Sequence, residues 1–171
     1  MHSDYLGNPV SPTSDTALAA IDTFVDGFLS YETRAAEVIG AAEAHPDSVL
    51  LNAYAATLWL LLEAPEAAER AAPYLARARA AVGQAHPREQ AFVAFVTAWS
   101  AEDIPGALAI ADTILAAWPR DLLALKLSQY HAFNRGDFPA MLRAASAVLP
   151  AAGDVAQLHG MVAFAYEQCH L

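Results

Sequence analysis

The sequence predicts an all-α fold, a solenoid of about nine antiparallel helices in which the last hairpin is incomplete. The strongest support is an internal repeat, because Asp103 and Pro105 recur 34 residues later as Asp137 and Pro139, each time before a similar apolar pattern. A second support is composition, since abundant alanine with only eight glycines favours helices that pack closely on small side chains. A third is the spacing of the prolines, which mark short connections between stretches of helical periodicity.

Residues 1–13 are predicted to form an extended N-terminal arm, followed by a helical repeat domain over residues 14–171. One glycine and two prolines give this arm a composition that resists helix formation. Ser14 then provides an N-cap signal, and the apolar residues that follow it as far as Leu29 form a single stripe. This pattern predicts the first helix.

The remaining helices are predicted from apolar periodicity and from the residues that end them. They are expected over residues 33–44, 49–62, 65–83, 86–100, 104–118, 122–135, 138–149 and 154–169. Pro73 predicts a kink or an early break in the fourth helix, because proline removes one backbone hydrogen bond. Gly136 predicts a left-handed C-terminal cap, and Pro150 is expected to stop the helix before it.

Charge and composition limit the classes of partner. The chain of 171 residues carries a formal net charge of −10 with only nine lysines and arginines, so we expect no nucleic-acid partner and no anionic membrane surface. The single cysteine, Cys169, cannot form an internal disulfide and indicates a reducing compartment. No secretory signal is visible, and the longest apolar run, residues 53–62, is far shorter than a membrane span. These features predict a soluble cytoplasmic protein.

The residue patterns of the sequence predict no catalytic residue, no cofactor and no metal site. No two of the six histidines lie at i, i+3 or i+4 on a helix with a carboxylate partner, and His45 and His86, each before a proline, are expected to cap helices. Tyr130 beside His131 is a candidate acid–base pair. Neighbouring helical residues point about a hundred degrees apart, so we expect these two to serve different surfaces. Cys169 is expected to be a small buried residue.

The concave wall of the predicted solenoid is the candidate binding surface, because the first helix of each hairpin lines it. Side chains one turn apart on the helices at 86–100, 122–135 and 154–169 then face a groove suited to an apolar or extended peptide, with Lys126 as a contact for a carboxylate. The candidate groove residues are Glu89, Phe92, Val96, Trp99, Lys126, Tyr130, Phe133 and Phe164. Aromatic residues at helical spacing are more often core, and this alternative stays open.

The last helix has the features of half a hairpin. Tyr166 and Ala163 fall at the aromatic and small-residue positions of the first helix of a repeat, and no second helix follows. Part of its apolar face is therefore expected to be exposed to solvent. The chain is interpreted as a fragment of a longer solenoid, or as a protein whose exposed end is covered by a partner or by a second copy in a homodimer.

A repeat of 34 residues has the tetratricopeptide length. Together with this period, several motifs resemble the tetratricopeptide repeat protein 38 family, over about residues 14–171. They are the run WPRDLLALKLS at residues 118–128, the Gly136-Asp137-Phe138 turn followed by Met141-Leu142-Arg143, and PREQ at residues 87–90. Members of that family are larger, so the resemblance implies the N-terminal portion of such a protein. It implies no catalytic residues.

These observations favour a non-catalytic scaffold that binds a protein or peptide in its concave groove. One alternative is that the chain forms one wall of a small-molecule or enzymatic site, for which Tyr130, His131 and Glu89 would have to surround one closed cavity. Another is a cap that mediates self-association through its C-terminal helix.

Overall fold

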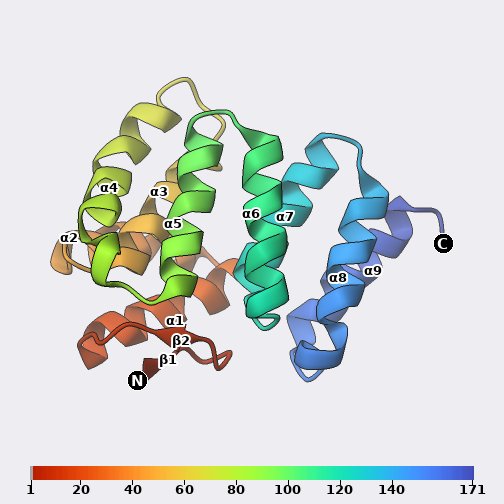
Figure 1. Cartoon of the computed structure of the whole chain (residues 1–171), viewed down its shortest axis with the longest axis horizontal. Helices are drawn as coiled ribbons and strands as arrows, with labels where there is room; N and C mark the ends of the chain where they lie inside the picture. Colours follow the sequence, from red (N-terminus) through yellow and green to blue (C-terminus); the bar gives the residue numbers. More distant parts are fainter. Residues whose placement is uncertain (1) are drawn as a thin grey trace.

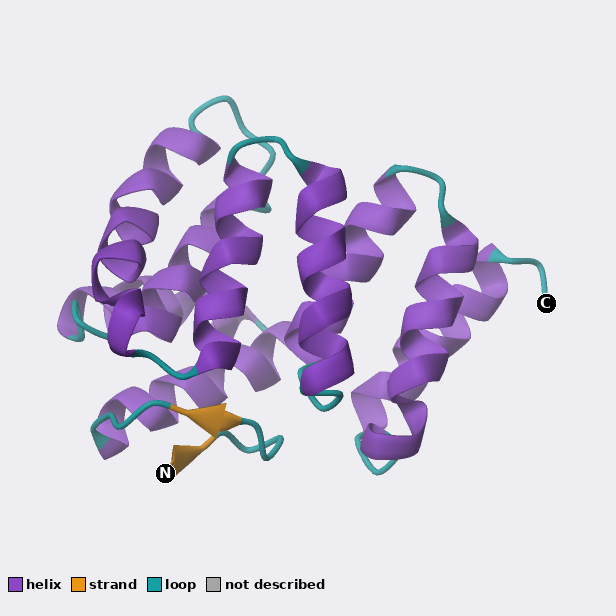
Figure 2. Ribbon diagram, viewed as in Figure 1, coloured by secondary structure: helices purple, strands orange, loops and turns teal. Residues whose placement is uncertain are grey.

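The computed structural model describes residues 2–171, and this part of the chain is all-α apart from one short hairpin (Figures 1 and 2). The nine α-helices of the described residues are α1 (Asp15–Leu29), α2 (Val38–Ala44), α3 (Val49–Leu60), α4 (Ala67–Ala81), α5 (Pro87–Ser100), α6 (Ile104–Ala117), α7 (Leu122–Asn134), α8 (Phe138–Ala152) and α9 (Ala156–Gln168). The shorter elements are β1 (His2–Ser3), β2 (Pro9–Val10) and the 3₁₀ helices η1 (Thr33–Glu37) and η2 (Val82–Gln84). The predicted all-α class is confirmed.

Helices that are consecutive in sequence lie side by side. The closest pairs are α3 with α4, α5 with α6, α7 with α8 and α8 with α9. In Figure 1, α4, α5, α6 and α8 form a front row, α3, α7 and α9 lie behind them, and α1 crosses the lower edge beside the hairpin. Contacts of α1 with both α3 and α7 connect these two helices of the back row. None of the helices in residues 2–171 has both the length and the apolar character needed to cross a membrane.

Six of the helices begin with a side chain that caps their free N–H groups, and in five of them this residue is a serine or an aspartate. The N-cap residues Ser14, Ser48, Asp103, Asp121 and Asp137 each accept a hydrogen bond from the backbone N–H three residues further on. Such a cap stabilises a helix by about 1 kcal/mol. The caps at the two aspartates of the internal repeat confirm the helix starts predicted there.

The two histidines that precede prolines also lie at helix ends. His45 occupies the C-cap of α2, and the His86 Nδ1 atom at the N-cap of α5 accepts from the N–H of Arg88 at 3.2 Å. After α7 the chain passes through Gly136, whose φ of +72° lies in the left-handed region where glycine carries no steric cost. The predicted C-terminal cap is thereby confirmed.

Pro150 does not end its helix, contrary to the sequence-based prediction, and the early break that was one of the two outcomes predicted for Pro73 does not occur. Pro73 lies inside α4, and Pro150 lies inside α8, which continues to Ala152. Both rings are on the exposed side, whereas Ala71 and Ala152, close to them in sequence, are fully buried. Burial of the opposite face keeps each helix continuous despite the lost hydrogen bond. The single helix predicted over residues 33–44 is divided into η1 and α2.

The predicted N-terminal arm is a folded hairpin. Strand β1 pairs with β2 in antiparallel register, with His2 opposite Val10, and Gly7 at a φ of +87° allows the turn between them. Leu6 and Val10 are both only 3 % exposed and belong to the main core. The arm avoids helix, as predicted, but it is packed against the helical domain.

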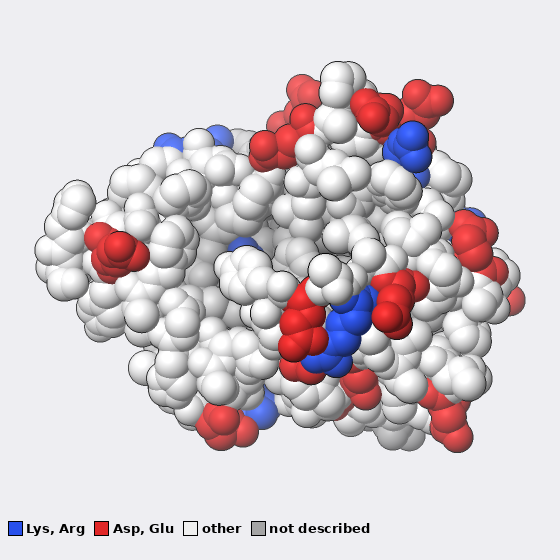
Figure 3. Space-filling model, turned by 180° about the vertical axis from the view of Figure 1, so that it is seen from behind, with Lys and Arg blue, Asp and Glu red and all other residues white. Residues whose placement is uncertain are grey.

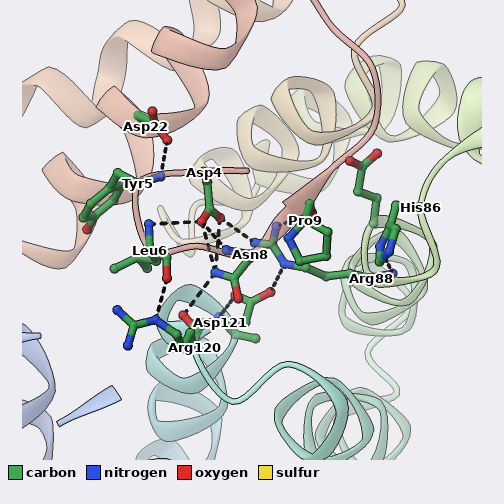
Figure 4. A network of polar contacts seen from close by, with 12 residues as sticks. Asp4, Tyr5, Leu6, Asn8, Pro9, Asp22, His86, Arg88, Arg120 and Asp121 are labelled. Atoms are coloured by element: carbon green, nitrogen blue, oxygen red, sulfur yellow. Dashed lines mark hydrogen bonds and ion pairs between the residues drawn. The ribbon is translucent and has the colours of Figure 1, made fainter. Parts of the chain in front are cut away.

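A buried ion network attaches this hairpin to the helices (Figure 4). Arg88 on α5 is 1 % exposed, its Nε donates to Asp121 Oδ2 at 2.7 Å, and its guanidinium lies 3.2 Å from Asp4 Oδ2. It also donates to the carbonyl of Pro9 at 3.1 Å. Burial alone would lower the pKa of Arg88, but the carboxylates of Asp121 and Asp4 raise it, so the guanidinium stays charged.

The carboxylates of this network have further partners. Asp4 accepts from the N–H of Leu6 at 3.1 Å and of Asn8 at 2.8 Å. Asp121 caps α7. The residue before it, Arg120, donates from Nε to the Leu6 carbonyl of the hairpin at 2.6 Å. The hairpin, α5 and the start of α7 therefore share one set of charge-assisted hydrogen bonds.

We expect Arg88→Met to lower the free energy of unfolding by about 3–5 kcal/mol, because Asp4 and Asp121 would stay buried without a countercharge. Urea unfolding followed by circular dichroism measures this change. Arg143→Met on the exposed surface of α8 is the matched control, with an expected change below about 0.5 kcal/mol. Equal effects of the two substitutions would contradict the stabilising role of the network.

Candidate functional site

The candidate site is a cavity of about 700 Å³ between α1, α3, α7 and α9. Figure 3, which shows the molecule from behind, has a hollow near the middle of this face, where uncharged atoms dominate and one small basic patch is visible. Its wall is formed by Phe28, Leu29, Tyr31, Leu58, Leu61, Leu62, Lys126, Leu127, Gln129, Tyr130, Phe133, Gln157, Gly160, Met161 and Phe164. Of these described residues only Lys126 is a lysine, arginine, aspartate or glutamate. The cavity is thus apolar with a single cationic group.

Four of the residues chosen from the sequence lie together in this wall: Lys126, Tyr130, Phe133 and Phe164. Phe133 on α7 and Phe164 on α9 are each 41 % exposed, and their ring centroids are 5.5 Å apart. Exposed aromatic rings in contact form an apolar rim at one side of the cavity.

The other four predicted groove residues, Glu89, Phe92, Val96 and Trp99, do not line it, and the sequence-based groove is corrected at these positions. Phe92, Val96 and Trp99 are between 0 % and 8 % exposed. The reason is that α3 packs on the inner side of α5, and α1 in turn packs on α3.

The covering helices contact α5 through a chain of aromatic rings. Phe24 of α1 stacks on Tyr54 of α3 with ring centroids 4.8 Å apart, and the edge of Tyr54 meets Phe92 at 5.2 Å. Further along α5, Phe95 and Trp99 lie 6.2 Å apart and continue this row into the core. The aromatic residues of α5 are therefore core residues, which was the open alternative.

Glu89 belongs to a different part of the molecule. It is 2 % exposed, its Oε1 atom accepts from the N–H of Ser11 at 2.6 Å, and it lines a second cavity of about 560 Å³ beside the N-termini of α1 and α3. Glu89 therefore does not share one closed cavity with Tyr130 and His131. The arrangement that would have favoured an enzymatic site is not present.

Lys126 connects α7 to the end of α1. Its Nζ atom donates to the carbonyls of Phe28 at 2.8 Å and Leu29 at 3.2 Å. These are among the last carbonyls of α1, where the helix dipole concentrates negative charge. The ring of Tyr31, with its centroid 3.4 Å from Nζ, covers another side of the ammonium. Burial lowers the pKa of Lys126 to about 8.

Tyr130 and His131 both have shifted pKa values but do not form an acid–base pair with a buried carboxylate. The Tyr130 hydroxyl donates to Glu63, and burial together with this bond raises its pKa to about 12. The His131 ring is 4 % exposed and packs edge-on against Trp99, with centroids 4.6 Å apart. Burial lowers the pKa of His131 to about 4, against the opposing effect of Glu63, so the imidazole is neutral at pH 7.

No sequence pattern indicated the half of the wall contributed by α1, α3 and the segments that follow them. Phe28, Tyr31 and Leu62 come from there. The 34-residue count does not reach these helices, because the repeat containing α4 is longer. Trp59 on α3 does not line this wall and lies beneath the guanidinium of Arg70, 4.9 Å from its ring centroid.

Metal chemistry has no candidate site in the part of the chain that the structure describes, because it holds no group of three or more His, Cys, Asp or Glu side chains that could bind an ion. Cys169 is half-buried beyond the end of α9 rather than fully buried as expected. Comparison with protein-family models, with curated proteins and with solved structures found no match for this chain. The assignment of function therefore rests on the cavity itself.

We expect the free energy of unfolding to fall as pH is lowered from about 6.5 to about 4, because unfolded His131 binds a proton in this window and the folded imidazole does not. The loss attributable to His131 is about 1–3 kcal/mol. It is measured as the difference in urea stability between the wild type and His131→Phe at a series of pH values, which cancels the other titrating groups. A difference that does not change with pH would contradict the neutral, buried state of His131.

Proposed function

We propose that this chain is a non-catalytic binding module that takes an apolar ligand into the cavity between α1, α3, α7 and α9. One observation supports it above the others: a cavity of about 700 Å³ has an apolar wall with a single charged group. This volume falls within the range of about 300–1,000 Å³ that is usual for ligand sites. Burial of a ligand's apolar surface would supply about 25 cal/mol per Å² of that surface removed from water.

We further propose that the helices form a tetratricopeptide-like solenoid. In support, the turns before α6 and α8 repeat in detail: the N–H of Asp103 donates to the Ala98 carbonyl and that of Asp137 to the Ala132 carbonyl, both at 2.9 Å. Each aspartate then caps the following helix, 34 residues apart. The resemblance to the tetratricopeptide repeat protein 38 family is part of the same proposal.

Two kinds of ligand are compatible with this function. Apolar side chains of a protein or peptide partner could enter the cavity past the exposed rings of Phe133 and Phe164. A small amphipathic molecule is the second candidate, and the presence of one charged side chain in an otherwise uncharged wall favours it. Exposed Phe164 and Tyr166 on α9, at 41 % and 44 %, support the weaker proposal of self-association through that helix.

We expect Gly160→Leu to block the cavity, because Gly160 lies in its wall and a Cβ atom at this position would meet nothing within 4 Å. The leucine side chain would therefore extend into open space without disturbing its neighbours. Fluorescence of the neutral apolar probe N-phenyl-1-naphthylamine should rise on binding to the wild type and lose at least about 10-fold in affinity with the variant.

Gly40→Leu on α2 is the matched control, since Gly40 also has open space around it and lies outside the cavity. It should leave the affinity for the probe unchanged. Absence of probe binding by the wild type, or equal loss in both variants, would contradict the proposed site. Displacement of the probe by an apolar decapeptide or by an alkyl compound distinguishes the two kinds of ligand.

A further inference from the structure

The position of Lys126 carries information about the ligand. It is the only lysine of the chain, which has a net charge of −10, yet it lies in the apolar cavity rather than on the surface. A lysine ammonium has three N–H donors and no acceptor. Two of them go to the carbonyls of Phe28 and Leu29. The third N–H donor faces the ring of Tyr31, which is a weak acceptor compared with an anion.

The charge of Lys126 is not matched by a carboxylate of the protein. Each ion pair within residues 2–171 is made by an arginine: Arg34, Arg77, Arg88 or Arg120. The described wall of the cavity holds no aspartate or glutamate, and the Tyr130 hydroxyl, whose pKa burial raises to about 12, donates to Glu63. A partly desolvated cation therefore faces the cavity without a countercharge.

We propose that the cavity binds an aliphatic monocarboxylic acid, with its carboxylate on Lys126 Nζ and its hydrocarbon chain along the apolar wall towards Phe133 and Phe164. The inference rests on the proposed apolar-ligand function and specifies the ligand of that same site. Tyr31, with its side chain 87 % exposed, covers the ammonium on the solvent side and would move aside or pack on the carboxylate.

The dimensions of the wall fit a medium-length chain. Lys126 and Phe133 are seven residues apart on α7, which is two turns or about 10 Å along the helix axis. An extended chain of about eight to ten carbons covers that distance. The exposed rings of Phe133 and Phe164 would then contact its far end.

The charge of the site favours a monoanion over a phosphate or other dianion. The only cation in the described wall is Lys126, and the helix end beside it is the C-terminus of α1, whose carbonyls repel further negative charge. A neutral alcohol would leave the ammonium without a countercharge. A carboxylate meets both conditions, because it carries a single negative charge and accepts a hydrogen bond from the remaining N–H of Lys126.

Binding should also be linked to protonation. The pKa of Lys126 is lowered to about 8 by burial, so the amine is mainly protonated at pH 7. A carboxylate at Nζ favours the charged form and raises this pKa. The groups that face Lys126 are the two α1 carbonyls, which carry no titratable proton, and the face of the Tyr31 ring. Affinity for the acid is therefore expected to fall as the pH rises above about 8.

The test compares decanoate with decanol, which has the same chain without the charge. Displacement of N-phenyl-1-naphthylamine at pH 7 should give an affinity at least about 10-fold higher for decanoate. Lys126→Met, which keeps an unbranched apolar side chain but lacks the ammonium, should reduce decanoate to the affinity of decanol and leave decanol unchanged. Retained decanol binding shows that the variant still folds and keeps its cavity.

A second measurement needs no variant. Protein labelled with [¹³C]lysine gives a single side-chain Cε resonance, from Lys126, whose titration reports its pKa directly. Decanoate should raise the titration midpoint by at least about one pH unit from its value near 8, and decanol should not. An unchanged midpoint in saturating decanoate would overturn the proposed contact.

The outcomes separate the two proposals. If decanol binds as tightly as decanoate in the wild type, the carboxylate ligand is wrong and the apolar binding function stands. If neither compound displaces the probe but an apolar decapeptide does, the ligand is a peptide and the carboxylic-acid inference is overturned. If the probe itself does not bind, the proposed function fails, and the inference fails with it.

Discussion

The contact between the end of α1 and Lys126 of α7 is the constraint on which the candidate site depends. It joins residues 98 and 97 positions apart, since Nζ of Lys126 donates to the carbonyls of Phe28 and Leu29. Without α1 in this place, the cavity would lack one of its four helices. The hairpin network around Arg88 acts on the same region, because it holds the chain that leads into α1.

The buried polar groups of this molecule fall into two kinds. Arg88 is matched by Asp4 and Asp121 and also donates to the Pro9 carbonyl, so its role is to hold the hairpin on the helices. Lys126 is only partly matched, by carbonyl groups, and faces a cavity. His131 is neutral among aromatic rings and packs as part of the core. Lys126 thus differs from Arg88 in having no carboxylate partner, and this unmatched charge is the reason for proposing a ligand at Lys126 rather than a structural network.

A single charge in an apolar cavity defines a class of ligand rather than one compound. Hydrophobic contact along the wall is nondirectional, and one ammonium fixes only the position of an anionic head group. Selection among chain lengths would then depend on the far rim, where Phe133 and Phe164 contact each other and Phe138 packs beside Phe133. The same rim is the exposed apolar surface at which a protein partner would first meet the site.

The sequence by itself determined the local structure of this protein. Helix periodicity, the capping aspartates Asp103 and Asp137 and the left-handed Gly136 depend on residues within a few positions of each other, and all were predictable. The repeat period also placed Lys126 and Phe133 on one face of one helix, a relation that the α-helix itself enforces.

Only the tertiary structure decided which faces are covered. On α5, Phe92 is buried against Tyr54 of α3, and Trp99 is buried against His131 of α7. Arg88 is an ion-pair centre because the hairpin returns to it. Those contacts join segments tens of residues apart, and no local pattern of residues encodes them.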